Sequence, residues 1–182
     1  MVRCPPARAA RAFTLLELVV TLAIAAGLFA LAVPSFAEFI AEQRLLNEAR
    51  RVAESITLAR TEAMKRNGHV VMCASTPGVD CADVRHWHEG WVTFSDPDGN
   101  AELSGDEAAF AREAAAAPGT TIVGNRPVEQ FLRFDYVGQP RMPNGALQMG
   151  TITVCRSQVR GYRVVLANTG RTRIDRMPAP CP

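Results

Sequence analysis

Two hydrophobic patterns follow one another in the first third of the chain. Residues 18–37 include no charged side chain, and as a helix they would extend about 30 Å, the thickness of one hydrocarbon core. Residues 36–63 instead place apolar side chains at steps of three and four, with charged side chains between them. Asn67 and Gly68 then supply a helix stop. The pattern predicts one helix from about Thr14 to Arg66, whose first half suits lipid and whose second half packs on a domain.

Beyond Gly68 the chain changes to short apolar runs separated by turn residues. These runs predict strands at 69–74, 87–95, 120–123, 130–137, 151–156 and 162–167. Residues 106–117 are rich in alanine, which favours a short helix over an irregular strand. The predicted fold class is α+β, with an antiparallel β-sheet domain packed on the second half of one long helix.

Charge is distributed unevenly, although the net charge of the whole chain is only +2. Residues 80–113 carry nine acidic side chains against two arginines, whereas residues 118–182 carry nine arginines against three acidic side chains. A basic C-terminal region of this kind raises the question of a polyanionic partner.

The first twelve residues form a basic segment ahead of the apolar run. They contain three arginines and no acidic residue, which favours a cytoplasmic location for this end of the chain. Glu17 stands at the front of the apolar run, where an unpaired carboxylate in lipid costs about 2.5–3.5 kcal/mol. A helix that packs against copies of itself can supply a cation to this glutamate. The alternative is a secretory signal peptide cut after residue 32, but the helical pattern continues past that point.

Four of the five cysteines follow the apolar run, while Cys4 lies in a segment that we expect to be removed. These four are Cys73, Cys81, Cys155 and Cys181. An even number of cysteines beyond a membrane segment predicts two disulfides and an oxidising compartment. Sequence proximity favours Cys73–Cys81 and Cys155–Cys181 among the three pairings. A zinc site that includes His86 and His88 is the alternative, although no CxxC spacing supports it.

The acidic segment after residue 95 is a second candidate metal site. Oxygen-bearing side chains occupy alternate positions, as in a calcium loop, at Asp96, Asp98, Asn100 and Glu102, and Asp106 and Glu107 follow. Because Ala101 occupies the position where an EF-hand needs glycine, we predict a solvated acidic turn without a metal. The three histidines belong to no nucleophile motif, and the chain has no phosphate-binding loop. We therefore predict neither an enzyme nor a cofactor.

Residues 12–36 resemble the class III signal sequence of type IV pilins and pseudopilins. The resemblance implies that prepilin peptidase cuts between Ala12 and Phe13, and that Phe13 is then N-methylated. It also implies that Glu17 pairs with the terminal amine of a neighbouring subunit during assembly. Ala12 departs from the glycine that is usual before the cut. The implied organisation is a leader peptide at 1–12, a transmembrane and assembly helix at 13–40 in the inner membrane, and a periplasmic pilin-like domain at 41–182.

The order of the later motifs is similar to that of the GspH/FimT class of minor pseudopilins. The run at 59–67 leads into 71–75, and Cys81, the sequence at 90–94 and the turn at 96–100 follow. The similarity covers nearly the whole chain. It implies a low-copy subunit, often near the filament tip, whose partners are other pilin subunits.

The Gly-Arg-x-Arg sequence at 170–173 resembles the DNA-binding loop of FimT-type pilins. The resemblance implies non-specific DNA capture in natural transformation, and guanidinium groups on an exposed loop match phosphate oxygens well. The expected DNA contacts are Gly170, Arg171, Arg173, Arg176, Arg160 and Arg163. The alternative is a minor pseudopilin of a type II secretion system that has a structural tip role and binds no DNA.

Overall fold

The computed structural model describes residues 14–76, 80–81, 85–105, 107 and 109–182. The chain divides into two compact units, Met1–Phe39 and Ile40–Pro182, and helix α1 (Leu15–Arg66) contributes residues to both. The prediction of a single helix from about Thr14 to Arg66 is therefore confirmed to within one residue.

In the first unit, Thr14 directly precedes α1, and its Oγ1 accepts a hydrogen bond from the Glu17 N–H at 3.2 Å. Glu17 thereby lies in the first turn, where the helix dipole favours a carboxylate. The large apolar side chains that the structure describes in this unit are exposed, from 81% at Leu15 to 48% at Val20. Within the part of the chain that the structure describes, no helix has the length and hydrophobicity needed to cross a membrane.

In the second unit, the amphipathic half of α1 buries one face completely. This face repeats at steps of three and four and consists of Leu45, Ala49, Val52, Ile56, Ala59 and Ala63, none more than 1% exposed. The helix ends as predicted: Asn67 adopts φ +50°, and the Gly68 N–H donates to Ala63 O at 3.1 Å.

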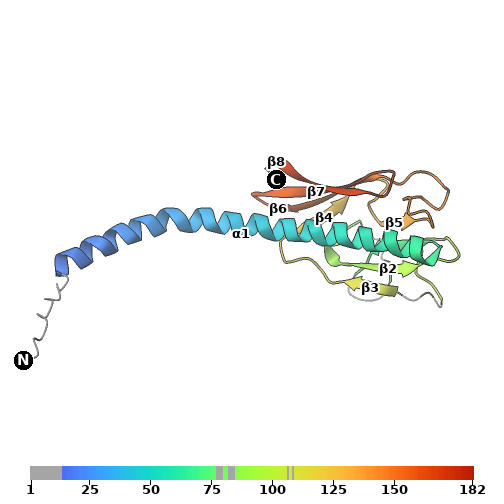
Figure 1. Cartoon of the computed structure of the whole chain (residues 1–182), viewed down its shortest axis with the longest axis horizontal. Coiled ribbons are helices and arrows are strands. Elements are labelled where there is room, and N and C mark those ends of the chain that lie inside the picture. Colours follow the sequence, from blue (N-terminus) through green and yellow to red (C-terminus); the bar gives the residue numbers. More distant parts are fainter. Residues whose placement is uncertain (1–13, 77–79, 82–84, 106, 108) are drawn as a thin grey trace, which may run out of the picture. The chain divides into compact units, whose positions relative to one another are not determined.

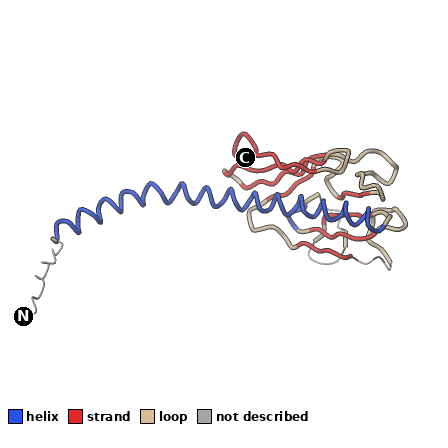
Figure 2. The backbone as a smooth tube through the Cα atoms, viewed as in Figure 1, coloured by secondary structure: helices blue, strands red, loops and turns tan. Residues whose placement is uncertain are grey.

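Two four-stranded antiparallel sheets pack on this half of α1 (Figures 1 and 2). The first has the order β3-β2-β1-β5, with β1 at Val70–Ala74, β2 at Trp91–Ser95, β3 at Ala109–Glu113 and β5 at Phe131–Phe134. The second has the order β4-β6-β7-β8, with β4 at Thr121–Gly124, β6 at Gly150–Arg156, β7 at Val159–Leu166 and β8 at Thr172–Pro180. A short 3-10 helix, Trp87–Glu89, precedes β2.

One hydrophobic core joins the helix to both sheets. It contains Met72 and Phe134 from the first sheet and Ile122 and Ile152 from the second, all essentially inaccessible to solvent. Trp87 is fully buried in the same core and donates its Nε1–H to Val128 O at 3.1 Å. A smaller cluster covers the far face of the first sheet, where Val71, Cys73, Val92 and Phe94 pack with Ala101. Strand β1 is therefore buried on both faces.

Two of the secondary-structure predictions are wrong. Residues 106–117, where alanine favours a helix, contain β3, because pairing with β2 outweighs the intrinsic preference of alanine. Residues 172–180, where the sequence predicts no strand, form β8. This segment contains two prolines, which mask the strand pattern, but β8 lies at a sheet edge, where proline is tolerated.

Both disulfides join cysteines that are close in sequence. Cys73 is bonded to Cys81 and Cys155 to Cys181, with Cα–Cα distances of 5.5 and 5.8 Å. These are the pairings that sequence proximity favours. The second disulfide attaches the residue after β8 to the end of β6.

Candidate nucleic-acid interface

The hairpin of β7 and β8 carries the Gly-Arg-x-Arg sequence at its turn. The Ala167 N–H donates to Arg171 O, and the Gly170 N–H donates to Ala167 O, each at 2.9 Å. Gly170 adopts φ +77°, a conformation that glycine adopts without steric penalty. Arg171 follows directly and is exposed, but Arg173 lies within β8. The prediction that both arginines project from a loop is therefore wrong for Arg173, which strand pairing holds in place.

The strand register assigns each arginine of the hairpin to a face. Arg163 lies opposite Asp175, and Arg173 lies opposite Val165. The alternate residues Val164 and Ile174 pack on the core, so Arg163, Arg173 and Asp175 point away from it. Arg163 is exposed, and the side chain of Arg173 is 66% exposed. We call Arg163, Arg171 and Arg173 the outer arginines.

Asp175 is the counter-charge on this surface. Its Oδ2 lies 3.0 Å from Arg173 Nε, and both side chains are largely open to solvent. An exposed pair of this kind contributes about 1 kcal/mol at most, so Arg173 can exchange Asp175 for another anion at little cost. With three guanidinium groups and one carboxylate, the surface has a local charge of +2.

Arg176 lies on the opposite face of β8 and binds α1. Its Nη2 lies 2.7 Å from Glu42 Oε2, its Nε contacts Glu42 Oε1, and the Tyr162 hydroxyl donates to the same Oε1 at 3.3 Å. The hydrogen bond from Arg176 holds the pKa of Glu42 below its ordinary value, and the charge of Arg160 acts in the same direction. Burial, followed by the charge of Glu42, raises the pKa of Tyr162.

The six predicted DNA contacts are therefore not one surface. Arg176 binds Glu42, whose pKa the charge of Arg160 also lowers, whereas Arg171 is exposed at the turn and Arg163 and Arg173 face outward. Because the pKa of Glu42 is lowered in the folded state, its stabilising contribution is present above the ordinary carboxyl pKa. That contribution is lost as the pH falls through the lowered value.

Arg60 of α1 supports the hairpin turn, which the sequence gives no reason to expect. Its Nε donates to Gly138 O at 3.0 Å. A Cβ added to Gly170 would collide with the same oxygen and lie 2.9 Å from Arg60 Nε, so the two turns and the arginine are in close contact. Tyr136 and Val137, beside Gly138, are 58% and 55% exposed. Arg60 therefore contacts the turn that carries Arg171, and the exposed Tyr136 lies two residues before Gly138 in the neighbouring turn.

The remaining predicted functional residues belong to the N-terminal part of the sequence. Ala12 and Phe13 lie outside the described residues. Glu17 is exposed in the first turn of α1.

Comparison with known proteins identifies the family. The profile of the family "Type II transport protein GspH" matches residues 48–170 and so ends just before Arg171. No curated protein sequence matches the chain.

Two crystal structures of the type IV minor pilin FimU from Pseudomonas aeruginosa (strain PAO1) have a similar fold. One has a TM-score of 0.53 at 15% identity and covers 74% of this chain and 98% of that chain. The other has a TM-score of 0.57 at 16% identity and covers 78% and 98%. The family match spans more than half of the sequence, and the long helix packed on antiparallel sheets is the type IV pilin-like fold. The chain thus belongs to the GspH family of minor pilins and pseudopilins.

Proposed function

We propose that the chain is a minor pilin that binds DNA without sequence preference, as part of DNA uptake in natural transformation. The observation that carries the proposal is the hairpin of β7 and β8. It places Arg171 and the outward-facing pair Arg163 and Arg173 at a solvent-exposed surface with Asp175 as the carboxylate among them. Guanidinium groups bind phosphate oxygens in a bidentate manner, and the exposed Asp175 is a weak competitor.

The position of these arginines favours phosphate contacts over base contacts. They stand on a tight turn and on strands, rather than on a helix that could enter the major groove. Phosphate contacts give affinity for DNA but do not distinguish one base sequence from another. Arg60 and the exposed ring of Tyr136, next to the turn, are supporting contacts, whereas Arg176 is engaged by Glu42.

The Arg171→Gln/Arg173→Gln variant tests this proposal. For about three neutralised phosphates, log affinity of the wild type for duplex DNA falls with log salt at a slope of about −3. Removing two of the three cations is expected to flatten that slope by nearly 2. Fluorescence anisotropy of a labelled duplex of arbitrary sequence, titrated with the full chain at about 50 and 200 mM salt, measures both slopes.

A matched control removes two charges elsewhere. Arg85 and Arg126 are exposed and lie near Glu129, and neither belongs to the β7–β8 hairpin. The Arg85→Gln/Arg126→Gln variant changes the net charge by the same amount, and we expect it to keep the wild-type slope. Equal losses in both double variants would show that only the total charge matters, and would contradict the assignment to the hairpin.

The competing function is that of a type II secretion pseudopilin with no DNA binding. The name of the matched family favours it, because that name refers to type II transport. In that role the outer arginines would pair with acidic residues of a neighbouring subunit. Wild-type protein that fails to bind DNA at low salt would support this function instead. So would a deletion strain that remains transformable but secretes poorly.

The proposal includes membrane anchoring and assembly. The leader at 1–12 is removed by prepilin peptidase, the helix at 13–40 lies in the inner membrane before assembly, and the domain at 41–182 is periplasmic. Glu17 pairs with the terminal amine of a neighbouring subunit. Mass spectrometry of the mature protein is expected to find a methylated N-terminal Phe13. A mature chain that begins after Ala32 would instead indicate an ordinary signal peptide.

A further inference from the structure

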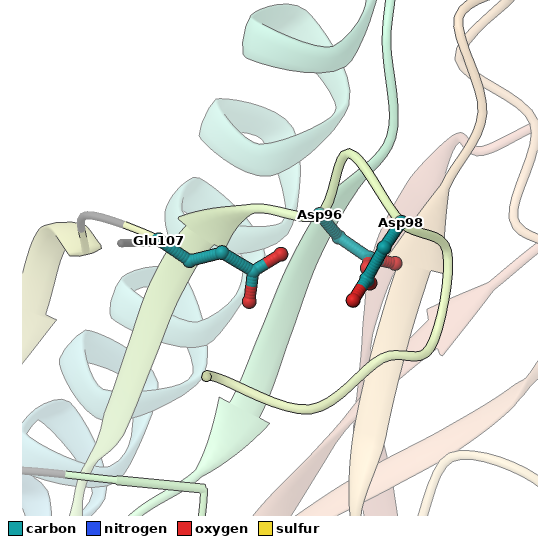
Figure 3. Close-up of side chains that lie close together, drawn as sticks. All are labelled: Asp96, Asp98 and Glu107. Atoms are coloured by element: carbon teal, nitrogen blue, oxygen red, sulfur yellow. The ribbon is translucent and has the colours of Figure 1, made fainter. Parts of the chain in front are cut away.

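Three carboxylates meet beside the far face of the first sheet. Asp96 follows β2, Asp98 lies in the next turn, and Glu107 comes two residues before β3. One oxygen from each lies within 4.8 Å of the others. Figure 3 shows the carboxylate of Glu107 directed from the opposite side toward those of Asp96 and Asp98.

Asp96 is the buried member of this cluster, and one of its oxygens has no partner. The side chain is 0% exposed, and its Oδ2 accepts a hydrogen bond from Arg133 Nε at 3.0 Å. The other oxygen, Oδ1, is buried and accepts no hydrogen bond from the described residues. A buried charged oxygen without a partner is strongly unfavourable.

Glu107 presents a second buried oxygen of this kind. Its Oε2 accepts the Ser104 N–H at 3.0 Å, but its Oε1 has no partner among the described residues. Two unpartnered carboxylate oxygens, one of them on a fully buried side chain, thus belong to one cluster. The other oxygen of each of these two side chains, Asp96 Oδ2 and Glu107 Oε2, accepts a hydrogen bond within the protein, and this holds the two carboxylates in place.

The charge of the cluster matches a divalent cation. Three carboxylates and the guanidinium of Arg133 give a net charge of −2. Arg133 donates to Asp96 Oδ2 and leaves Oδ1 without a partner among the described residues. Its own position is fixed: it is 8% exposed, and its backbone N–H donates to the buried Gln148.

The ligand chemistry favours calcium among the common divalent ions. All three ligands are carboxylate oxygens, whereas zinc prefers sulfur and imidazole nitrogen. Calcium accepts about six to eight oxygen ligands in a flexible geometry, whereas magnesium requires a near-ideal octahedron, so an irregular set of carboxylates completed by water suits calcium better.

The geometry differs from that of the calcium loop considered in the sequence. Ala101, at the position where an EF-hand needs glycine, adopts a left-handed φ of +62°. Asn100 Oδ1 accepts the Glu102 N–H at 2.6 Å, and Glu102 is exposed. Of the oxygen-bearing residues considered in the sequence, Asp96, Asp98 and Glu107 meet, whereas Asn100 and Glu102 lie outside the cluster.

We propose that Asp96, Asp98 and Glu107 bind one Ca²⁺, with water completing the coordination. The ion would join the segment after β2 to the segment before β3. Since Ala101 of that segment packs on the far face of the first sheet, bound calcium would also hold this covering in place. This inference is independent of DNA binding, because the site belongs to the other sheet.

Calorimetry and thermal unfolding of the full chain, stripped with EDTA and titrated with CaCl₂, test the proposal. We expect one Ca²⁺ per chain, a Kd of about 10⁻⁴ M and clearly weaker binding of Mg²⁺. At about 100 times the Kd, the Tm is expected to rise by about 5–10 °C.

Two glutamine variants in the same segment provide the matched comparison. Glu107→Gln removes a ligand carboxylate from a half-buried side chain, and we expect it to weaken calcium binding by at least about tenfold. Glu102→Gln removes an exposed carboxylate outside the cluster, and its calcium affinity is expected to stay within about twofold of wild type.

Circular dichroism in EDTA shows whether each variant is folded. The Asp98→Asn variant removes a second carboxylate of the cluster, from a side chain that is exposed. Absence of a calcium-dependent rise in the wild-type Tm up to about 10 mM calcium would overturn the proposal. It would also be overturned if folded Glu107→Gln bound calcium as tightly as Glu102→Gln.

Discussion

Replacing Gly170 with alanine is expected to lower the free energy of unfolding by about 3 kcal/mol. The φ of +77° costs a residue with a Cβ about 1–2 kcal/mol. The added methyl group would also collide with the backbone oxygen of Gly138 and lie 2.9 Å from Arg60 Nε. Overpacking of this kind costs about 1–3 kcal/mol. The Gly138 oxygen cannot move away freely, because it accepts the hydrogen bond from Arg60. Urea denaturation measures the loss.

Gly145→Ala is the matched control for backbone conformation. Gly145 adopts φ +82°, but an added Cβ would meet no atom within 4 Å. Only the conformational term applies, so the expected loss is about 1 kcal/mol. The difference between the two variants measures the contact between the two turns. Equal losses would show that the hairpin turn is free to move away from Gly138 and Arg60.

The same pair of variants relates the turn to the proposed DNA binding. The displaced turn of Gly170→Ala carries Arg171, so this variant is expected to bind duplex DNA more weakly than wild type. Gly145→Ala is expected to bind as wild type does. If folded Gly170→Ala binds DNA normally, the exact position of Arg171 is unimportant, and the charge of the hairpin alone accounts for binding.

Features with a strong local pattern are predictable from this sequence. The helix to Arg66 follows from a 3.6-residue repeat over many turns, and its end follows from the Asn67-Gly68 stop. The buried strands β1 and β2 follow from short runs of large apolar residues. Here each residue's surroundings depend mainly on its near neighbours in sequence.

Strand β8 is not predictable from its own sequence pattern. Two prolines and three charged residues dilute its alternation, and only the ladder with β7 makes it a strand. That ladder also decides which face each arginine occupies. Arg173 and Arg176 are three residues apart, yet one faces solvent beside Asp175 and the other binds Glu42. Without the register, the sequence groups them as one basic cluster.

Contacts between distant segments were likewise beyond sequence patterns. Arg60 belongs to a regular helical repeat, and nothing nearby indicates that it reaches the turn at Gly138. The sequence places Asp96, Asp98 and Glu107 in a possible calcium loop, but it does not show that these three side chains meet or that one oxygen of the buried Asp96 lacks a partner. The pairing of β2 with β3, which brings the two segments together, replaces the helix that alanine content favours.

Removing the Cys155–Cys181 disulfide is expected to lower the free energy of unfolding by about 3.5 kcal/mol, because the two cysteines are separated by 26 residues. The structure adds a local effect. Strand β8 is at the sheet edge and pairs only with β7, and beyond its end the Cys181 N–H donates to Val159 O at 2.9 Å. In Cys155→Ser/Cys181→Ser, β8 is expected to fray from its C-terminal end. Amide hydrogen exchange near Arg176 should then accelerate more than exchange near Thr172, which adjoins the turn.

The other disulfide separates this local effect from the general one. Cys73 and Cys81 are separated by only 8 residues, so Cys73→Ser/Cys81→Ser is expected to lose about 2.5 kcal/mol by the same loop-entropy argument. Cys73 lies in β1, and Cys81 packs beside the first sheet. In this variant, amide exchange in β8 is expected to accelerate only by the amount that the lower global stability predicts. Thiol titration of the native wild-type protein should find no reactive thiol at any of the four positions. If both variants open β8 equally before global unfolding, the edge strand depends on overall stability, and the disulfide at its end gives it no particular protection.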